Sequence, residues 1–197
     1  MNTKEFTLIY PWDTNGYCPD VRYVMGVDKA GFTMHITVPE ANPRRVMTHN
    51  FQPVCLDSCV EWFVNFLPEK NDGYFNFETN ALGTINVSFQ KKRLDPYRRP
   101  LTEQEIASLQ ICADIYEDHW EISYRVPFAL IRSYIPDYRF REGMTIRANF
   151  YKCGGHTQFV HHGVWNAIPI DKPDFHRPEY FGEIVLADAP HTVDGIR

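Results

Sequence analysis

The sequence feature that most constrains the fold is a set of short runs in which apolar and polar residues alternate. The clearest run covers residues 32–38, where the apolar positions are Phe32, Met34, Ile36 and Val38 and the polar ones are Thr33, His35 and Thr37. Because successive side chains of a strand point to opposite faces, this run predicts a β-strand that buries one face. The sequence Asp-Lys-Ala-Gly at 28–31 predicts a hairpin turn from a preceding strand at 21–27.

Similar strand patterns recur along most of the chain. They cover residues 59–67, 74–80, 84–89, 111–116, 120–126, 145–151 and 182–186. Two short helices are also predicted, one at the Thr102–Glu105 capping box and one that begins at Pro127. The sequence contains no internal repeat and no regular alternation of strands with helices. We therefore expect one all-β domain over residues 1–197, an antiparallel β-sandwich of about nine strands with one or two short helices.

The charge balance and the cysteines bear on partners and on location. With 20 basic and 25 acidic residues the net charge is -5, so nucleic acid is not an expected partner. No stretch is apolar for long enough to span a membrane, so no membrane partner is expected either. Five cysteines without a CxxC pair, and no visible signal peptide, predict a cytoplasmic protein with reduced thiols, although a removed leader would leave the same sequence. The sequence does not predict an oligomeric state.

Several predicted strands carry polar residues on the face opposite their apolar set. These residues are Glu61, Asn76, Glu78, Arg147 and Asn149, with Arg125 as a weaker addition. If the strands share a sheet, the carboxylates, amides and guanidinium would form one polar surface that suits sugar hydroxyls, which both donate and accept hydrogen bonds. An ordinary solvated sheet face explains the alternation as well, and alternation alone favours this simpler interpretation.

The four tryptophans fall into two groups. Trp62 and Trp120 share a face with apolar neighbours and are predicted to lie in the core. Trp12 and Trp165 lie in loop-like segments, where an aromatic ring can remain exposed for a ligand to stack on. A loop that caps the edge of the core is the alternative for both.

The residues that can hold metal ions show no recognisable pattern. The histidines lack ligand-like spacing, and adjacent His161 and His162 would point in opposite directions on a strand, so no metal site is expected. A structural calcium ion is conceivable, although no calcium-binding loop motif supports it. Its ligands would come from Asp57, Asp72, Asp171 or Asp174.

Five segments in order resemble family 9 carbohydrate-binding modules. Their sequences are DSCVEWF at 57–63, YFNFETNALGT at 74–84, WEI at 120–122 with Val-Pro at 126–127, RANFY at 147–151, and Trp165 followed by FHRPEYFG at 175–182. The resemblance implies a β-sandwich that binds glycans through aromatic stacking and polar hydrogen bonds, usually as an accessory to glycoside hydrolases. The first third of the chain and residues 91–108 depart from the family pattern.

The leading hypothesis is therefore a non-catalytic carbohydrate-binding module without a cofactor. A sugar would stack on Trp165, opposed by Trp12, and would hydrogen-bond to Glu61, Asn76, Glu78, Arg147 and Asn149. One alternative is a small glycoside hydrolase that uses Glu61 and Glu78 as its carboxylate pair. The other is a haem or redox domain of the related DOMON type, in which Met47, Met144 or a histidine would ligate the iron.

Overall fold

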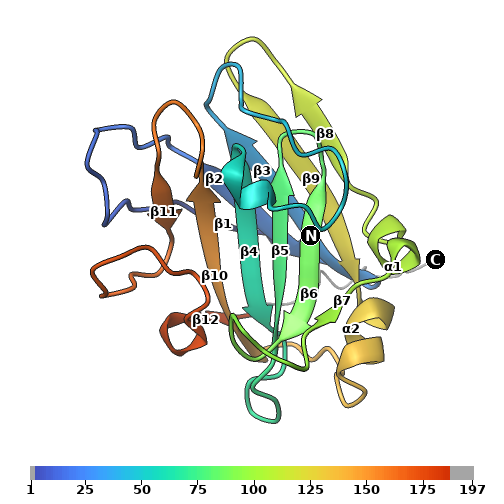
Figure 1. Ribbon diagram of the computed structural model, residues 1–197. Coiled ribbons are helices and arrows are strands. Elements are labelled where there is room, and N and C mark those ends of the chain that lie inside the picture. Colours follow the sequence, from blue (N-terminus) through green and yellow to red (C-terminus); the bar gives the residue numbers. More distant parts are fainter. Residues whose placement is uncertain (1–2, 187–197) are drawn as a thin grey trace, which may run out of the picture.

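The chain forms two antiparallel β-sheets packed face to face, which confirms the predicted sandwich (Figure 1). The computed structural model describes residues 3–186, so both ends of the predicted domain 1–197 lie outside the described residues. The five-stranded sheet has the order β1 (Thr3–Phe6), β2 (Arg22–Val27), β3 (Gly31–Val38), β9 (Trp120–Pro127), β8 (Cys112–Ile115).

The second sheet has seven strands and lies in front of the first in Figure 1. Its order is β11 (His162–Val164), β10 (Thr145–Cys153), β4 (Cys59–Asn65), β5 (Tyr74–Asn80), β6 (Ile85–Gln90), β7 (Arg99–Pro100), and β12 (Gly182–Val185) also pairs with β10. Residues 3–186 thus form twelve strands rather than about nine. The strands that alternation did not predict are β1, β7 and β11, which have two to four residues each and are too short to show a period of two.

The core lies between the sheets and is rich in aromatic residues. Trp62 and Trp120 are fully buried, as predicted. Trp62 on β4 stacks on Phe77 and Phe150 of its own sheet and contacts Phe32 of the other sheet. Large aromatic side chains therefore join the two layers.

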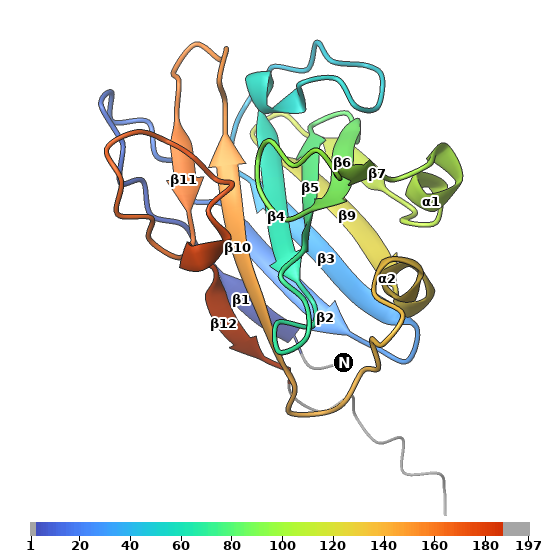
Figure 2. The same ribbon diagram turned by 60° about the horizontal axis from the view of Figure 1, so that its bottom comes forward.

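Helices occupy little of the chain, and both predicted helices are present. Helix α1 (Glu103–Ala107) begins at the capping box, where Thr102 and Glu105 bond to each other's backbone. Helix α2 (Phe128–Tyr134) follows Pro127, and the two helices lie on the β7 side of the sandwich (Figure 2). The remaining helical turns are 3₁₀ segments, η1 (Val54–Leu56) and η2 (Pro178–Tyr180). Within residues 3–186, no helix has the length and apolar character needed to cross a membrane.

Candidate functional site

The outer face of the seven-stranded sheet, which points away from the core, carries the predicted polar residues of β4, β5 and β10. Glu61 lies directly opposite Glu78 on β5 and opposite Tyr151 on β10. Both glutamates are buried, with exposed fractions of 3% and 6%. Side chains on an open, solvated sheet face would be far more exposed. The glutamates are buried because other parts of the chain cover this face of the sheet.

The chain that covers Glu61 is the segment that follows β11, residues 165–181. Phe175 stacks on Tyr151 with ring centroids 4.2 Å apart, and Nδ1 of His176 lies 2.8 Å from the hydroxyl of Tyr74. These contacts belong to a second apolar cluster, separate from the main core, that also includes Phe63 and Phe181. The family-like sequence FHRPEYFG at 175–182 therefore fastens the covering segment onto the sheet.

Arg147 and Asn149 on β10 hold this covering segment against the sheet through hydrogen bonds. Asn149 donates to the carbonyl of Asn166, 2.9 Å away, and its Oδ1 accepts from the backbone N–H of Asn166. Nη2 of Arg147 donates to the carbonyls of Glu179 and Phe181 at 3.1 and 3.0 Å. Two of the five polar residues predicted to bind ligand thus form hydrogen bonds with the protein's own backbone.

Asn76 and Glu78 belong to a connected polar layer beneath the cover. Oε1 of Glu78 accepts from Asn76 at 2.6 Å and Oε2 accepts from Asn86 at 3.0 Å. Ser88 donates to Oδ1 of Asn76 and accepts from Nε of Arg98. This layer satisfies its polar atoms internally, as buried polar groups require.

The two facing glutamates have perturbed acidities. Burial raises the pKa of Glu61 well above its usual value, and the adjacent Glu78 carboxylate raises it further. Burial also raises the pKa of Glu78, against the opposing effect of hydrogen bonds from Asn76 and Asn86. Burial and like charge both favour the protonated carboxylic acid.

The tryptophans expected to stack on a sugar lie apart from this polar layer. Trp165 is half-buried on the core side, where its ring meets Phe6 and Phe150 edge-on at 5.0 and 5.7 Å. Trp12 packs beside Phe175 and donates from Nε1 to the carbonyl of Ile170. The structure therefore does not bring Trp165 together with Glu61 or Glu78.

The other residues considered from sequence, Arg125, Met47 and Met144, lie in different parts of the structure. Arg125 lies on β9 of the other sheet and pairs with Asp28 at 2.7 Å. Met144 lies in the main core, whereas Met47 packs against the second cluster.

Of the four aspartates considered for calcium, Asp171 is exposed and the others have protein partners. Asp57 accepts backbone N–H bonds from Val46 and Met47. Asp72 pairs with Lys91, and Asp174 pairs with Arg93.

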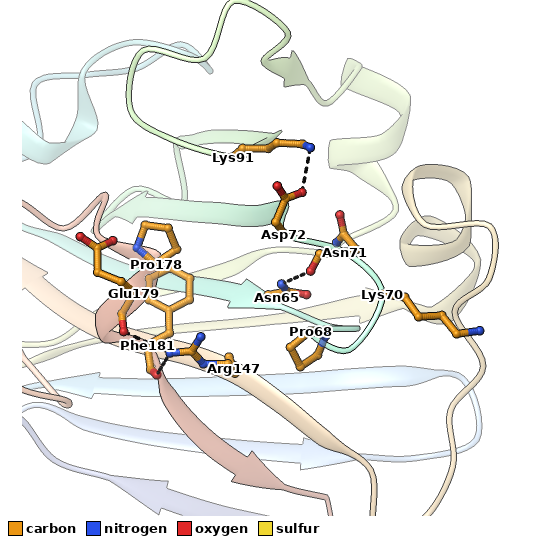
Figure 3. Close-up of a pocket in the computed structure, with 10 residues that line it drawn as sticks. All are labelled: Asn65, Pro68, Lys70, Asn71, Asp72, Lys91, Arg147, Pro178, Glu179 and Phe181. Carbon is orange, nitrogen blue, oxygen red and sulfur yellow. Dashed lines mark hydrogen bonds and ion pairs between the residues drawn. The ribbon is translucent and has the colours of Figure 1, made fainter.

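A solvent-accessible hollow of about 540 Å³ lies where the covering segment reaches the Asn65 end of β4 (Figure 3). One wall is formed by Arg147, Pro178, Glu179 and Phe181, and the opposite wall by the turn that follows β4 and by Lys91. Its remaining lining residues are Asn65, Pro68, Lys70, Asn71 and Asp72. The hollow thus combines carboxylates, cations and amides with the apolar surfaces of Pro68, Pro178 and Phe181.

Sequence reasoning identified only Arg147 among the residues of this hollow as a ligand contact. Lys70 and Asp72 lie in the turn between β4 and β5, which has no periodicity, and Glu179 lies in η2, within the family-like sequence at 175–182. The ion pair between Asp72 and Lys91, 2.8 Å long, forms because the turn after β4 and the loop after β6 meet in space.

Fold and site together place the chain in the class of two-sheet β-sandwich modules. Its residues 165–181 lie over part of the polar outer face of the seven-stranded sheet. The chain belongs to carbohydrate-binding family 9, since the model of that family matches residues 4–186. No curated protein matches the chain.

Three solved structures share the fold. A candidate carbohydrate-binding protein from Bacteroides uniformis is 25% identical with a TM-score of 0.79, and the match covers 93% of this chain and 86% of that one. A family 9 module from Caldicellulosiruptor kristjanssonii in complex with cellotriose is 10% identical with a TM-score of 0.65, covering 99% and 88% of the two chains. A family 9 module from the same organism in complex with glucose is 10% identical with a TM-score of 0.63, covering 96% and 88%.

Proposed function

We propose that this protein is a non-catalytic carbohydrate-binding module and that a sugar binds in the hollow drawn in Figure 3. Family membership over residues 4–186 supports the ligand class. The structural neighbours in complex with glucose and cellotriose have the same fold and agree with it. The proposed location rests on one observation: charged and apolar groups line the same hollow, and this hollow is open to solvent.

The chemistry of the hollow suits a polyhydroxylated ligand. Asp72 and Glu179 offer carboxylate acceptors, and their side chains are 74% and 52% exposed. Lys70 and the guanidinium of Arg147 offer donors, and Pro178 with Phe181 offers an apolar surface for the C–H face of a sugar ring. Of the residues predicted from sequence, Arg147 keeps a direct role in this proposal. Asn149 holds the covering segment in place.

The test is calorimetric titration with glucose and cello-oligosaccharides, preceded by a glycan array. In Asp72→Asn we expect sugar affinity to fall about ten- to hundredfold, since a hydrogen bond to a charged group contributes roughly 1.5–3 kcal/mol. Asp118→Asn is the matched control, because Asp118 is 87% exposed in the turn between β8 and β9, and it should bind as the unaltered protein does. Absence of binding across the array would contradict the function.

The location is tested separately with Glu61→Gln. If the sugar binds in the hollow, this substitution beneath the covering segment leaves affinity unchanged. Loss of binding in Glu61→Gln with normal binding in Asp72→Asn would move the ligand to the covered face, where Glu61, Asn76 and Glu78 lie.

A glycoside hydrolase is the second candidate, and one observation favours it. Glu61 and Glu78 face each other across β4 and β5, and their raised pKa values suit a general acid. This candidate predicts turnover of aryl glycosides that is lost in Glu61→Gln. The non-catalytic proposal predicts no turnover in either protein.

A further inference from the structure

Three potential metal ligands meet on the outer sheet face, at the end of β4 away from the hollow. Cys59 on β4 lies directly opposite Cys153 on β10 in the strand register, and Glu61 follows two residues after Cys59 on the same face. One ligand atom from each of the three lies within 4.8 Å of the other two. All three residues are buried, with exposed fractions of 0%, 2% and 3%.

The distances within this cluster are close to those of a tetrahedral metal site. Oε1 of Glu61 lies 2.9 Å from Sγ of Cys153 and 3.9 Å from Sγ of Cys59. Around a tetrahedral zinc ion with Zn–S bonds of about 2.3 Å and Zn–O bonds of about 2.1 Å, a sulfur and an oxygen ligand lie about 3.6 Å apart. The two observed oxygen–sulfur distances lie on either side of this value, and the strand register places Cys59 and Cys153 opposite each other.

Buried cysteines commonly act as small apolar side chains. Here both thiols approach a buried carboxylate, an arrangement that apolar packing alone does not require. A third cysteine, Cys55, lies in η1, and its carbonyl is 3.5 Å from Sγ of Cys153. Sulfur and carboxylate oxygen together favour zinc(II) over the hard cations calcium and magnesium.

The cluster also has an opening on one side. Glu61 and Cys153 line a cavity of about 210 Å³ together with Cys55, His162 and Phe175. Catalytic and exchangeable zinc sites typically have three protein ligands and one open position. A water molecule in this cavity can supply the fourth ligand.

We propose that Cys59, Glu61 and Cys153 form a zinc(II) site whose fourth position faces this cavity. A bound ion connects β4 to β10 and neutralises the two thiolates that binding creates. The site is independent of the proposed sugar hollow, and its occupancy is measured without sugar. Failure of one proposal therefore leaves the other intact.

The state of the ligands without metal predicts how binding depends on pH. Zinc binds cysteine as the thiolate, whereas an ordinary thiol has a pKa of about 8.5. Both thiols are therefore protonated near neutral pH and must each release a proton to bind zinc. Binding releases these two protons, and that of Glu61 where its carboxyl is protonated, so the apparent affinity rises at least about hundredfold for each pH unit between pH 6 and 8.

The experiment is titration of the anaerobically reduced protein with Cd²⁺ and then Zn²⁺. Cd²⁺ reports thiolate ligation through its ultraviolet charge-transfer absorption, and calorimetry in buffers of different ionisation enthalpy counts the protons released. We expect one ion per chain and two or three protons released, two from the thiols and a third where the Glu61 carboxyl is protonated. Cys153→Ser and Cys59→Ser should each weaken binding at least hundredfold, and Glu61→Gln should weaken it while keeping the thiolate absorption.

The matched control is the double variant Cys18→Ser with Cys112→Ser, because both of these cysteines are exposed and lie away from the cluster. It should bind Cd²⁺ as the unaltered protein does. Circular dichroism establishes that each variant is folded.

Any of three results would overturn the proposal. One is the absence of stoichiometric binding by the reduced protein. Another is binding that survives in Cys153→Ser or disappears in the control variant. The third is a chain that forms a Cys59–Cys153 disulfide on exposure to air and, when reduced again, takes up no ion.

Discussion

At the scale of single residues, a buried cation sets the protonation state of a histidine. Lys152 is fully buried, and its Nζ lies 2.8 Å from Nε2 of His161 and 3.4 Å from Oε2 of Glu40. Nδ1 of His161 donates to the carbonyl of Phe159. Since the ammonium group can only donate, Nε2 must accept, and the imidazole is neutral. Burial and the neighbouring Lys152 lower the pKa of His161 to about 4.

This depressed pKa predicts a loss of stability in mild acid. Between about pH 6.5 and 4 the unfolded chain protonates this histidine and the folded protein does not, so the free energy of unfolding falls as pH falls. The His161 contribution is at most about 1.4 kcal/mol per pH unit. Urea unfolding at several pH values should show a shallower decline in His161→Gln, whose amide oxygen can still accept from Lys152.

The difference between the two proteins isolates His161 from groups that act in the opposite sense, such as Glu61 with its raised pKa. His49→Gln is the control, since His49 is exposed, and its decline should match that of the unaltered protein. Equal slopes in His161→Gln and the unaltered protein would show that this imidazole is not kept neutral by the fold.

At the scale of elements, the pairing of β3 with β9 depends on a glycine. Gly31 lies opposite Pro127, where β9 gives way to α2. A Cβ atom at position 31 would lie 2.2 Å from the carbonyl oxygen of Val126. The alternation that begins at Phe32 predicts the strand, but this close approach of two backbones is visible only once the strands are paired.

Gly31→Ala is therefore expected to destabilise the protein by about 1–3 kcal/mol, the usual cost of forcing an extra group into a packed site. Chemical denaturation measures the change. Lys29→Ala, in the exposed turn two residues earlier, should change stability by less than about 0.5 kcal/mol. If Gly31→Ala left the stability unchanged, the two strands would be able to move apart at this point without a cost in free energy, which would contradict this account.

Strand length limited which elements could be predicted from sequence, although the four-residue strands β8 and β12 lie within predicted strands. Strands of six or more residues, such as β3, β5 and β9, carry enough alternation to be recognised. Strand β11 has three residues and forms because Tyr151 to Cys153 of β10 supply hydrogen-bonding partners. A pairing of this kind depends on a neighbour distant in sequence and leaves no local pattern.

At the scale of the whole molecule, Trp62 connects the two sheets. It contacts Phe32 of the five-stranded sheet, and Phe66, Phe77 and Phe150 on its own side. Its Nε1 is buried without a hydrogen-bond partner, so its contribution comes from packing.

Trp62→Ala should lower the free energy of unfolding by about 3–5 kcal/mol, because it leaves a large cavity between the layers. Trp62→Phe should cost clearly less, since it retains an aromatic ring and removes the unpaired N–H. Thermal and denaturant unfolding measure both, with Tyr97→Ala as the exposed control. Equal losses in the alanine and phenylalanine variants would contradict this account.

The sequence by itself determined nine of the twelve strands of residues 3–186, the inward position of Trp62 and Trp120, the capping box at Thr102 and the likeness to family 9, because each depends on residues close together in the chain. Tertiary structure alone decided that residues 165–181 cross the outer face. That crossing covers Glu61 and separates the hollow beside Arg147 from the cavity beside Cys153. Side-chain alternation specifies which face of a strand a residue occupies. It carries no information about which distant segment will cover that face.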